Sequence, residues 1–147
     1  MYKHILIPTD GSELSQKAVK GGIGLAKILG AQVTGFYAAP DFLLYAMAYE
    51  EVAPLMSQMD LEGETKKQAE EYLSFIEREA QAQRVPVDTL WVKHDSPYVA
   101  IIETAQKRGC DLIFMASHGR RGLGALVLGS ETMKVLTHTK IPVLVYR

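Results

Sequence analysis

A glycine-rich segment with basic residues follows a short apolar run in the last third of the sequence. Leu112–Ala116 is continuously apolar, which is typical of a strand buried on both faces, and residues 117–124 read SHGRRGLG. Gly129 and Ser130 then open a predicted helix, with Ser130 as a suitable N-cap. The free N–H groups and the dipole of a helix N-terminus favour anions. The segment therefore predicts a phosphate-binding loop.

The general nucleotide-binding motifs do not account for this loop. The chain has no G-x-x-x-x-G-K-[ST] motif, and the order of Gly119, Gly122 and Gly124 is not the G-x-G-x-x-G of dinucleotide-binding folds. The alternative interpretation is an ordinary surface loop, in which glycines form turns and Arg120 and Arg121 are merely solvated. We favour phosphate binding, because these two arginines place positive charge beside the predicted helix start.

The composition narrows the class of protein. A chain of 147 residues fits a single domain over residues 1–147, and a formal charge of −1 provides no general attraction for nucleic acid or anionic membranes. Cys110 is the only cysteine, which excludes an internal disulfide, and we expect it to be a small buried hydrophobe rather than a nucleophile. No apolar run resembles a signal peptide or a membrane span of about 20 residues. We therefore expect a cytoplasmic protein.

Apolar strand patterns alternate strictly with helical patterns along the chain. Strands are predicted at 4–8, 32–39, 87–92, 112–116 and 141–146, and helices at 13–29, from 60 or 65 to about 84, at 96–108, and from 130 to about 138. This alternation predicts an α/β fold, with a doubly wound five-stranded parallel sheet and helices on both faces. Ligands of such sheets bind beyond the carboxyl ends of the strands, so Asp10 is expected to face the phosphate loop.

Two stretches fit this pattern less simply. Gly21, Gly22 and Gly24 lie inside the first helix, and we attribute them to close packing of the helix on the sheet. Residues 41–59 are unusually apolar for a connection and have no single period. They predict either a loop with a short helix packed over the sheet edge, or a mobile cover or partner-binding surface.

Over essentially its whole length the chain resembles the universal stress protein family. Residues 8–12, PTDGS, resemble the start of that family, and the ending IPVLV resembles its finish. ATP-binding members carry G-x2-G-x9-G-[S/T], and Gly119, Gly129 and Ser130 match it with the correct spacing. Ala116 replaces the first glycine and adds one methyl group.

The resemblance implies a Rossmann-like fold with strand order 3-2-1-4-5 and a site for ATP, AMP or ADP, with Mg²⁺ bound through the phosphates. The implied nucleotide-binding residues are Pro8, Thr9, Asp10, Ala38, Met115, Ala116, His118, Gly119, Arg120, Gly129, Ser130 and Glu131. It also implies a homodimer paired through the last strand, with Val143, Val145 and Tyr146 at the interface. His4, His94 and His138 lie on separate elements, so we expect no metal site from the protein alone.

Three functions follow from these patterns. The first is a cytoplasmic, homodimeric, ATP-binding module of stress-response signalling, which requires no turnover. Such a module binds no nucleic acid and does not insert into a membrane. The second is a slow ATP hydrolase, in which His118 or Asp10 orients water. The third is a dimeric interaction protein that binds no nucleotide and uses residues 41–59. Two residues favour the third function. Ala116 replaces the first glycine of the family motif, and the charge of Glu131 would oppose a phosphate.

Overall fold

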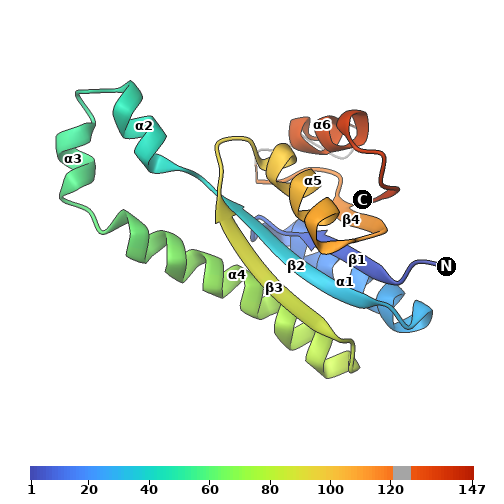
Figure 1. Ribbon diagram of the computed structural model, residues 1–147. Coiled ribbons are helices and arrows are strands. Elements are labelled where there is room, and N and C mark those ends of the chain that lie inside the picture. Colours follow the sequence, from blue (N-terminus) through green and yellow to red (C-terminus); the bar gives the residue numbers. More distant parts are fainter. Residues whose placement is uncertain (121–126) are drawn as a thin grey trace.

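Five parallel strands form one sheet with helices on both faces in a computed structural model that describes residues 1–120 and 127–147 (Figure 1). The strands are β1 His4–Pro8, β2 Gln32–Ala39, β3 Val87–Lys93, β4 Leu112–Ala116 and β5 Val143–Tyr146. The helices are α1 Glu13–Leu29, α2 Phe42–Ala48, α3 Ala53–Ser57, α4 Leu61–Gln83, α5 Pro97–Arg108 and α6 Ser130–His138. The strand order is β3-β2-β1-β4-β5, which confirms the predicted topology.

The core has two layers because side chains alternate across each strand. Ile5 and Ile7 of β1 point to the layer that α1 and α4 cover, whereas Leu6 points to the layer of α5 and α6. All three are fully buried. Burial on both faces explains why the central strands are continuously apolar instead of alternating.

Local signals in the sequence determine where α1 begins and ends. The Ser12 hydroxyl accepts the Ser15 N–H at 3.2 Å, which is a side-chain N-cap. Gly30 ends the helix with φ of 64°, a left-handed conformation that glycine adopts without a steric penalty. Asp60 caps α4 in the same way as Ser12, by accepting the Gly63 N–H at 3.1 Å.

Residues 41–60 form a segment that we call the arm. It contains α2 and α3, which stand away from the sheet beyond the carboxyl end of β2 (Figure 1). The sequence left two interpretations of residues 41–59 open, and the arrangement does not match the one in which they pack over the sheet edge. Several large apolar side chains of the arm are exposed, among them Leu43 at 70% and Met47 at 75%.

The three glycines inside α1 differ in their surroundings. A Cβ on Gly22 would lie 2.7 Å from Ile7 Cδ1, and one on Gly21 would lie 3.0 Å from the Tyr146 ring. A Cβ on Gly24 would meet nothing within 4 Å. Close packing on the sheet is therefore confirmed as the reason for Gly21 and Gly22, and it is wrong for Gly24.

Alanine substitutions should separate these two situations. Alanine at position 22 or 24 gains about 1 kcal/mol of helix propensity over glycine. At position 22 it also overpacks a filled core, which costs about 1 to 3 kcal/mol. Gly24→Ala should raise the free energy of unfolding by about 1 kcal/mol, and Gly22→Ala should lower it by about 1 kcal/mol. Urea unfolding measures both. Equal stabilisation by the two substitutions would contradict the packing explanation for Gly22.

Candidate functional site

The carboxyl end of β2 extends beyond the end of its neighbour β1. Their pairing ends with Pro8 opposite Phe36, and the Thr9 N–H donates to the Phe36 carbonyl at 2.9 Å. Because alternate residues of a parallel strand direct their backbone groups to the same side, Ala38 directs its N–H and C=O towards the side where β1 has ended. Neither group makes a hydrogen bond with a described residue. Ala38 therefore presents one donor and one acceptor to a ligand.

Asp10 connects the loop after β1 to the loop after β4. Its Oδ1 accepts the Ser12 N–H at 2.9 Å, and its Oδ2 accepts the Arg120 N–H at 3.0 Å. A Cβ on Gly119 would lie 2.2 Å from Asp10 Oδ2, so only glycine allows this approach. The structure thus brings together the two loops that the sequence placed at the same edge of the sheet.

The Arg120 side chain is held against α4. Its Nε donates to the Asp10 carbonyl at 3.1 Å, and its Nη2 donates to the Tyr72 hydroxyl. The guanidinium also lies 5.4 Å from the centre of the Tyr72 ring, a cation–π arrangement. Arg120 would have to leave these contacts to reach a phosphate. Its neighbour Arg121 lies outside the described residues.

Helix α6 begins at Ser130 as predicted, but its N-cap lies one residue earlier than expected. Gly129 is the N-cap, with φ of −62° and ψ of 152°, and Ser130 is the first helical residue, so the prediction of Ser130 as N-cap is wrong. The reason is tertiary: the Gly129 N–H donates to the Ser117 carbonyl at 2.7 Å, which fixes the chain in an extended conformation just before the helix. The N–H groups of Ser130, Glu131 and Thr132 find no acceptor among the described residues. Three donors at the positive end of a helix dipole therefore remain available to an anion.

The glycine at the N-cap packs directly against the loop after β4. A Cβ on Gly129 would lie 2.9 Å from the His118 Cα. The His118 ring nitrogen Nδ1 is 3.2 Å from the Ser117 hydroxyl, so the imidazole shapes its own turn. Glycine is thus required here for the packing of the loop on the helix, in addition to any role in anion binding.

Met115 and Ala116 lie in the core at the end of β4. Their side chains are 6% and 8% exposed, and they belong to opposite core layers. The Thr132 hydroxyl donates to the Ala116 carbonyl at 3.0 Å, which joins α6 to the strand end. The methyl group that replaces the family glycine is therefore accommodated among buried side chains.

Glu131 is directed to the neighbouring helix α5. Its Oε2 accepts the Tyr98 N–H in the first turn of α5 at 2.9 Å, and its Oε1 lies 3.4 Å from Lys134 Nζ. A carboxylate is favourable at a helix N-terminus. The charge that seemed from the sequence to oppose a phosphate is thus partly offset by α5 and Lys134.

Three residues that organise the site were not among the predicted binding residues. Tyr72 holds Arg120, Ser117 accepts the Gly129 N–H, and Thr132 ties α6 to β4. Tyr72 lies in the helix predicted to end at about residue 84, and a helical pattern does not locate its hydroxyl. Only the packing of α4 in the tertiary structure places the Tyr72 hydroxyl next to Arg120.

Two cavities lie near this end of the sheet. A cavity of about 150 Å³ is bordered by Thr9, Tyr72 and Arg120. A larger one, of about 440 Å³, lies under the arm and shares no lining residue with the predicted nucleotide site. Cys110 lies apart from both, where burial raises its thiol pKa to about 11, as suits a buried hydrophobe. Within the described residues, no group of three or more His, Cys, Asp or Glu side chains could hold a metal ion.

Comparison with known proteins decides the family. The family model described as "Universal stress protein family" matches residues 1–147. The chain is a universal stress protein. Universal stress protein MJ0531 of Methanocaldococcus jannaschii is 32% identical to it over 147 residues, which cover 100% of this chain and 83% of the relative.

Solved structures of universal stress proteins share the fold. The MJ0577 protein of the same organism superimposes with a TM-score of 0.81 at 27% identity, covering 99% of this chain and 96% of that one. An Archaeoglobus fulgidus universal stress protein in complex with dAMP gives a TM-score of 0.71 at 16% identity, covering 99% and 98%. A universal stress protein in complex with cAMP gives 0.68 at 21% identity, covering 99% and 97%.

The contact of Glu131 with α5 can be tested by its removal from this universal stress protein. Glu131→Ala leaves the Tyr98 N–H without its acceptor, and loss of such a cap costs about 1 kcal/mol. Glu103 on α5 is the control, because it is exposed and forms only an i,i+4 pair with Lys107 at 3.7 Å, worth about 0.3 to 0.5 kcal/mol. Urea unfolding should show the larger loss for Glu131→Ala. Equal losses would mean that Glu131 does not stabilise the start of α5.

Proposed function

We propose that this protein is a signalling module that binds ATP or another adenine nucleotide beyond the carboxyl ends of β1, β2 and β4. One observation carries the proposal. Among the described residues, the backbone groups of Ala38 and the N-terminus of α6 are without partners and lie at the same end of the sheet. Asp10 joins the loops after β1 and β4 at that end. An adenine edge needs a donor and an acceptor, and phosphates need N–H groups and a positive dipole.

Each predicted residue has a role in this proposal. Ala38 would bind the adenine edge through its backbone, and Asp10 would face the ribose or the phosphates. Gly119, Gly129 and Ser130 would hold the phosphates. The remaining predicted residues would form the walls and the support of the site: Pro8, Thr9, Met115, Ala116, His118, Arg120 and Glu131.

Relatives with bound nucleotides support adenine as the base. The two complexes contain cAMP and dAMP, which share the adenine ring and a phosphate. An adenine ring and a phosphate suit a site in which the backbone of Ala38 binds the edge of the base and the N-terminus of α6 binds the phosphate. ATP, the preferred ligand of this proposal, adds two phosphates, and Mg²⁺ bound through those phosphates would offset their charge.

We rank ATP hydrolysis below simple binding. The two side chains proposed to orient water already have partners, since Asp10 accepts two backbone N–H groups and His118 lies against the Ser117 hydroxyl. Both are thus occupied in shaping loops. A module that changes the conformation of its loop on binding, without turnover, uses these contacts directly.

A negative charge at Ser130 should separate binding from folding. Ser130 is exposed in the first turn of α6, where an acidic side chain stabilises the helix but repels phosphate. Ser130→Asp should weaken ATP binding at least about tenfold, or about 1.4 kcal/mol, with no loss of stability. Calorimetric titration of nucleotide-free protein with ATP and Mg²⁺, and then with AMP, measures this effect.

The matched control is Ser130→Asn, which has a similar size and no charge. Its affinity should stay within about threefold of the parent protein. If Ser130→Asp binds ATP as tightly as Ser130→Asn, the phosphates do not lie at this helix end. Released phosphate is assayed in the same samples. Steady release of phosphate from ATP would favour the hydrolase over the binding module.

We also infer a homodimer that pairs through β5. This strand forms an edge of the sheet, and its side chains are partly buried except for Leu144, which is exposed. Tyr146 packs in the layer of α1, and Val143 packs in the layer of α5 and α6. An unpaired apolar edge strand is a ready template for a second chain. Val143, Val145 and Tyr146 are the residues that we assign to this interface.

A charge on this strand should dissociate the dimer. Val145→Glu places a carboxylate on the pairing edge, so sedimentation equilibrium should show at least about a tenfold rise in the dimer dissociation constant. Ile28→Glu on α1 is the control, because Ile28 is 83% exposed and lies on another surface. A Val145→Glu protein that keeps the parental mass distribution would rule out pairing through β5.

The location in the cell remains a prediction. Among the described residues, no helix combines the length and apolar character needed to cross a bilayer. We expect a cytoplasmic protein from the sequence, and the nucleotide ligand is consistent with that expectation.

A further inference from the structure

The arm exposes more large apolar side chains than any other described segment. The exposed fractions are 70% for Leu43, 75% for Met47, 69% for Leu55 and 58% for Met59. Leu43 and Met47 are four residues apart on α2 and so share one face of that helix. Contiguous exposed apolar surface of this kind marks an interaction site, and methionine suits surfaces that adapt to a partner.

The charge of the same region has a single sign. Residues 41–65 contain six acidic residues and no lysine, arginine or histidine. The whole chain has a formal charge of only −1, so the negative charge of this region is balanced by positive charge elsewhere. Glu50 and Glu51 lie between α2 and α3, and both are exposed. Exposed apolar side chains and exposed carboxylates thus occur in the same segment.

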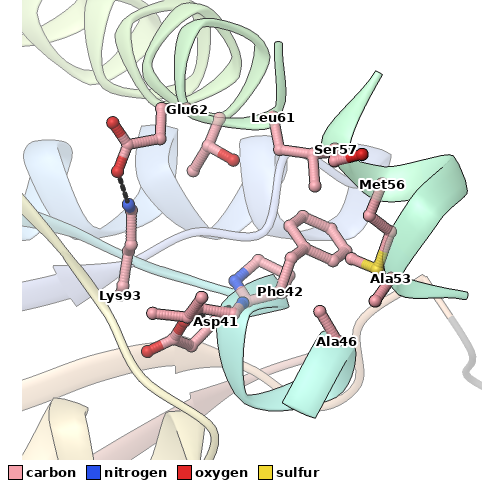
Figure 2. Close-up of a pocket in the computed structure, with 12 residues that line it drawn as sticks. Asp41, Phe42, Ala46, Ala53, Met56, Ser57, Leu61, Glu62 and Lys93 are labelled. Atoms are coloured by element: carbon pink, nitrogen blue, oxygen red, sulfur yellow. Dashed lines mark hydrogen bonds and ion pairs between the residues drawn. The ribbon is translucent and has the colours of Figure 1, made fainter. Parts of the chain in front are cut away.

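A cavity opens between the arm and the start of α4. It has a volume of about 440 Å³, and most of its lining is apolar. Figure 2 shows Phe42 in the middle of the cavity, close to Met56 and Leu61, whereas Lys93 and Glu62 face one another on one side at 2.9 Å. Because Glu62 neutralises Lys93, the border of the cavity remains acidic overall. The cavity has room for a large apolar side chain.

We propose that the arm binds a basic amphipathic helix of a partner protein. Apolar residues of that helix would cover Leu43 and Met47 and would place one side chain in the cavity beside Phe42. Lysine or arginine residues on its border would face Glu50, Glu51 and the other carboxylates. An apolar groove that receives the apolar face of a helix is a known mode of peptide recognition, and complementary charge determines which helices fit.

The charges disfavour the other occupants. An anionic bilayer would repel a segment that has carboxylates and no basic residue. Two copies of residues 41–65 from identical chains would bring twelve carboxylates together, twice the six of one copy. A small apolar molecule could fill the cavity, but it would leave the surface around Leu43 and Met47 in water.

The first experiment compares two synthetic peptides of the same apolar pattern. One is a 14-residue amphipathic helix of leucine and lysine, of the order of four helical turns, and the other has glutamate in place of every lysine. We expect the lysine peptide to bind the full chain in fluorescence anisotropy, with affinity that falls at least about tenfold between 50 and 500 mM salt. The glutamate peptide should not bind. Equal binding of the two peptides would overturn the proposal.

Matched variants assign the binding to the arm. Glu50→Lys with Glu51→Lys should lower the affinity for the lysine peptide at least about tenfold. The control, Glu13→Lys with Glu103→Lys, makes the same change in charge elsewhere and should change that affinity less than about threefold. Leu43→Gln with Met47→Gln should weaken binding at least about tenfold, with Ile28→Gln as the exposed apolar control. All these positions are exposed, so the urea midpoint of the arm variants should remain parental. Glu13→Lys with Glu103→Lys should lower it slightly, because the pairs with Lys17 and Lys107 are lost.

Three results would overturn the assignment. If arm and control variants lose affinity equally, the peptide binds through net charge alone. If Leu43→Gln with Met47→Gln lowers the mass of the protein alone in sedimentation, the occupant is a second copy of this chain. If the arm binds vesicles of anionic lipid more tightly than it binds the lysine peptide, it is a membrane-binding surface.

Discussion

The parallel pairing of β1 with β2 on one side and β4 on the other is the constraint on which this structure depends. Because the chain leaves β1 in one direction and later returns to its other side, two loops meet at the carboxyl end of β1. Since β1 stops at Pro8, Ala38 has β3 on one side but no strand on the side of β1. The contact of Asp10 with the Arg120 N–H then closes the two loops against each other. The site follows from this arrangement.

Backbone groups supply most of the recognition that we infer, and this explains how the site accommodates a departure from the family motif. The donors at the start of α6 are N–H groups, and the edge at Ala38 is also backbone. Ala116 takes part through its carbonyl, which accepts the Thr132 hydroxyl, while its methyl group is buried. An added methyl at this position therefore changes the core more than the site. The glycines at 119 and 129 are different, because a Cβ at either position would clash with Asp10 or with His118.

Charge is unevenly distributed at the end of the sheet where both inferred functions lie. The nucleotide site contains the N-terminus of α6, whose dipole favours anions. The arm carries only acidic charge and would attract cations. The connection of β2 to the arm through Pro40 places the two regions next to each other along the chain. Each region thus selects a ligand of opposite charge, which keeps a nucleotide and a basic helix from competing for one surface.

The sequence alone was sufficient for the α/β class, the strand order through family resemblance, and most helix ends, because periodicity and capping are local properties of the chain. It also identified the loop with Gly119 and the helix start at Ser130. Tertiary structure decided what those residues touch: Asp10 against Gly119, Glu131 on the start of α5, and Tyr72 on Arg120. It also moved the N-cap from Ser130 to Gly129 and showed that Gly24 has no close neighbour. Such contacts join residues far apart in the chain, so no local pattern specifies them.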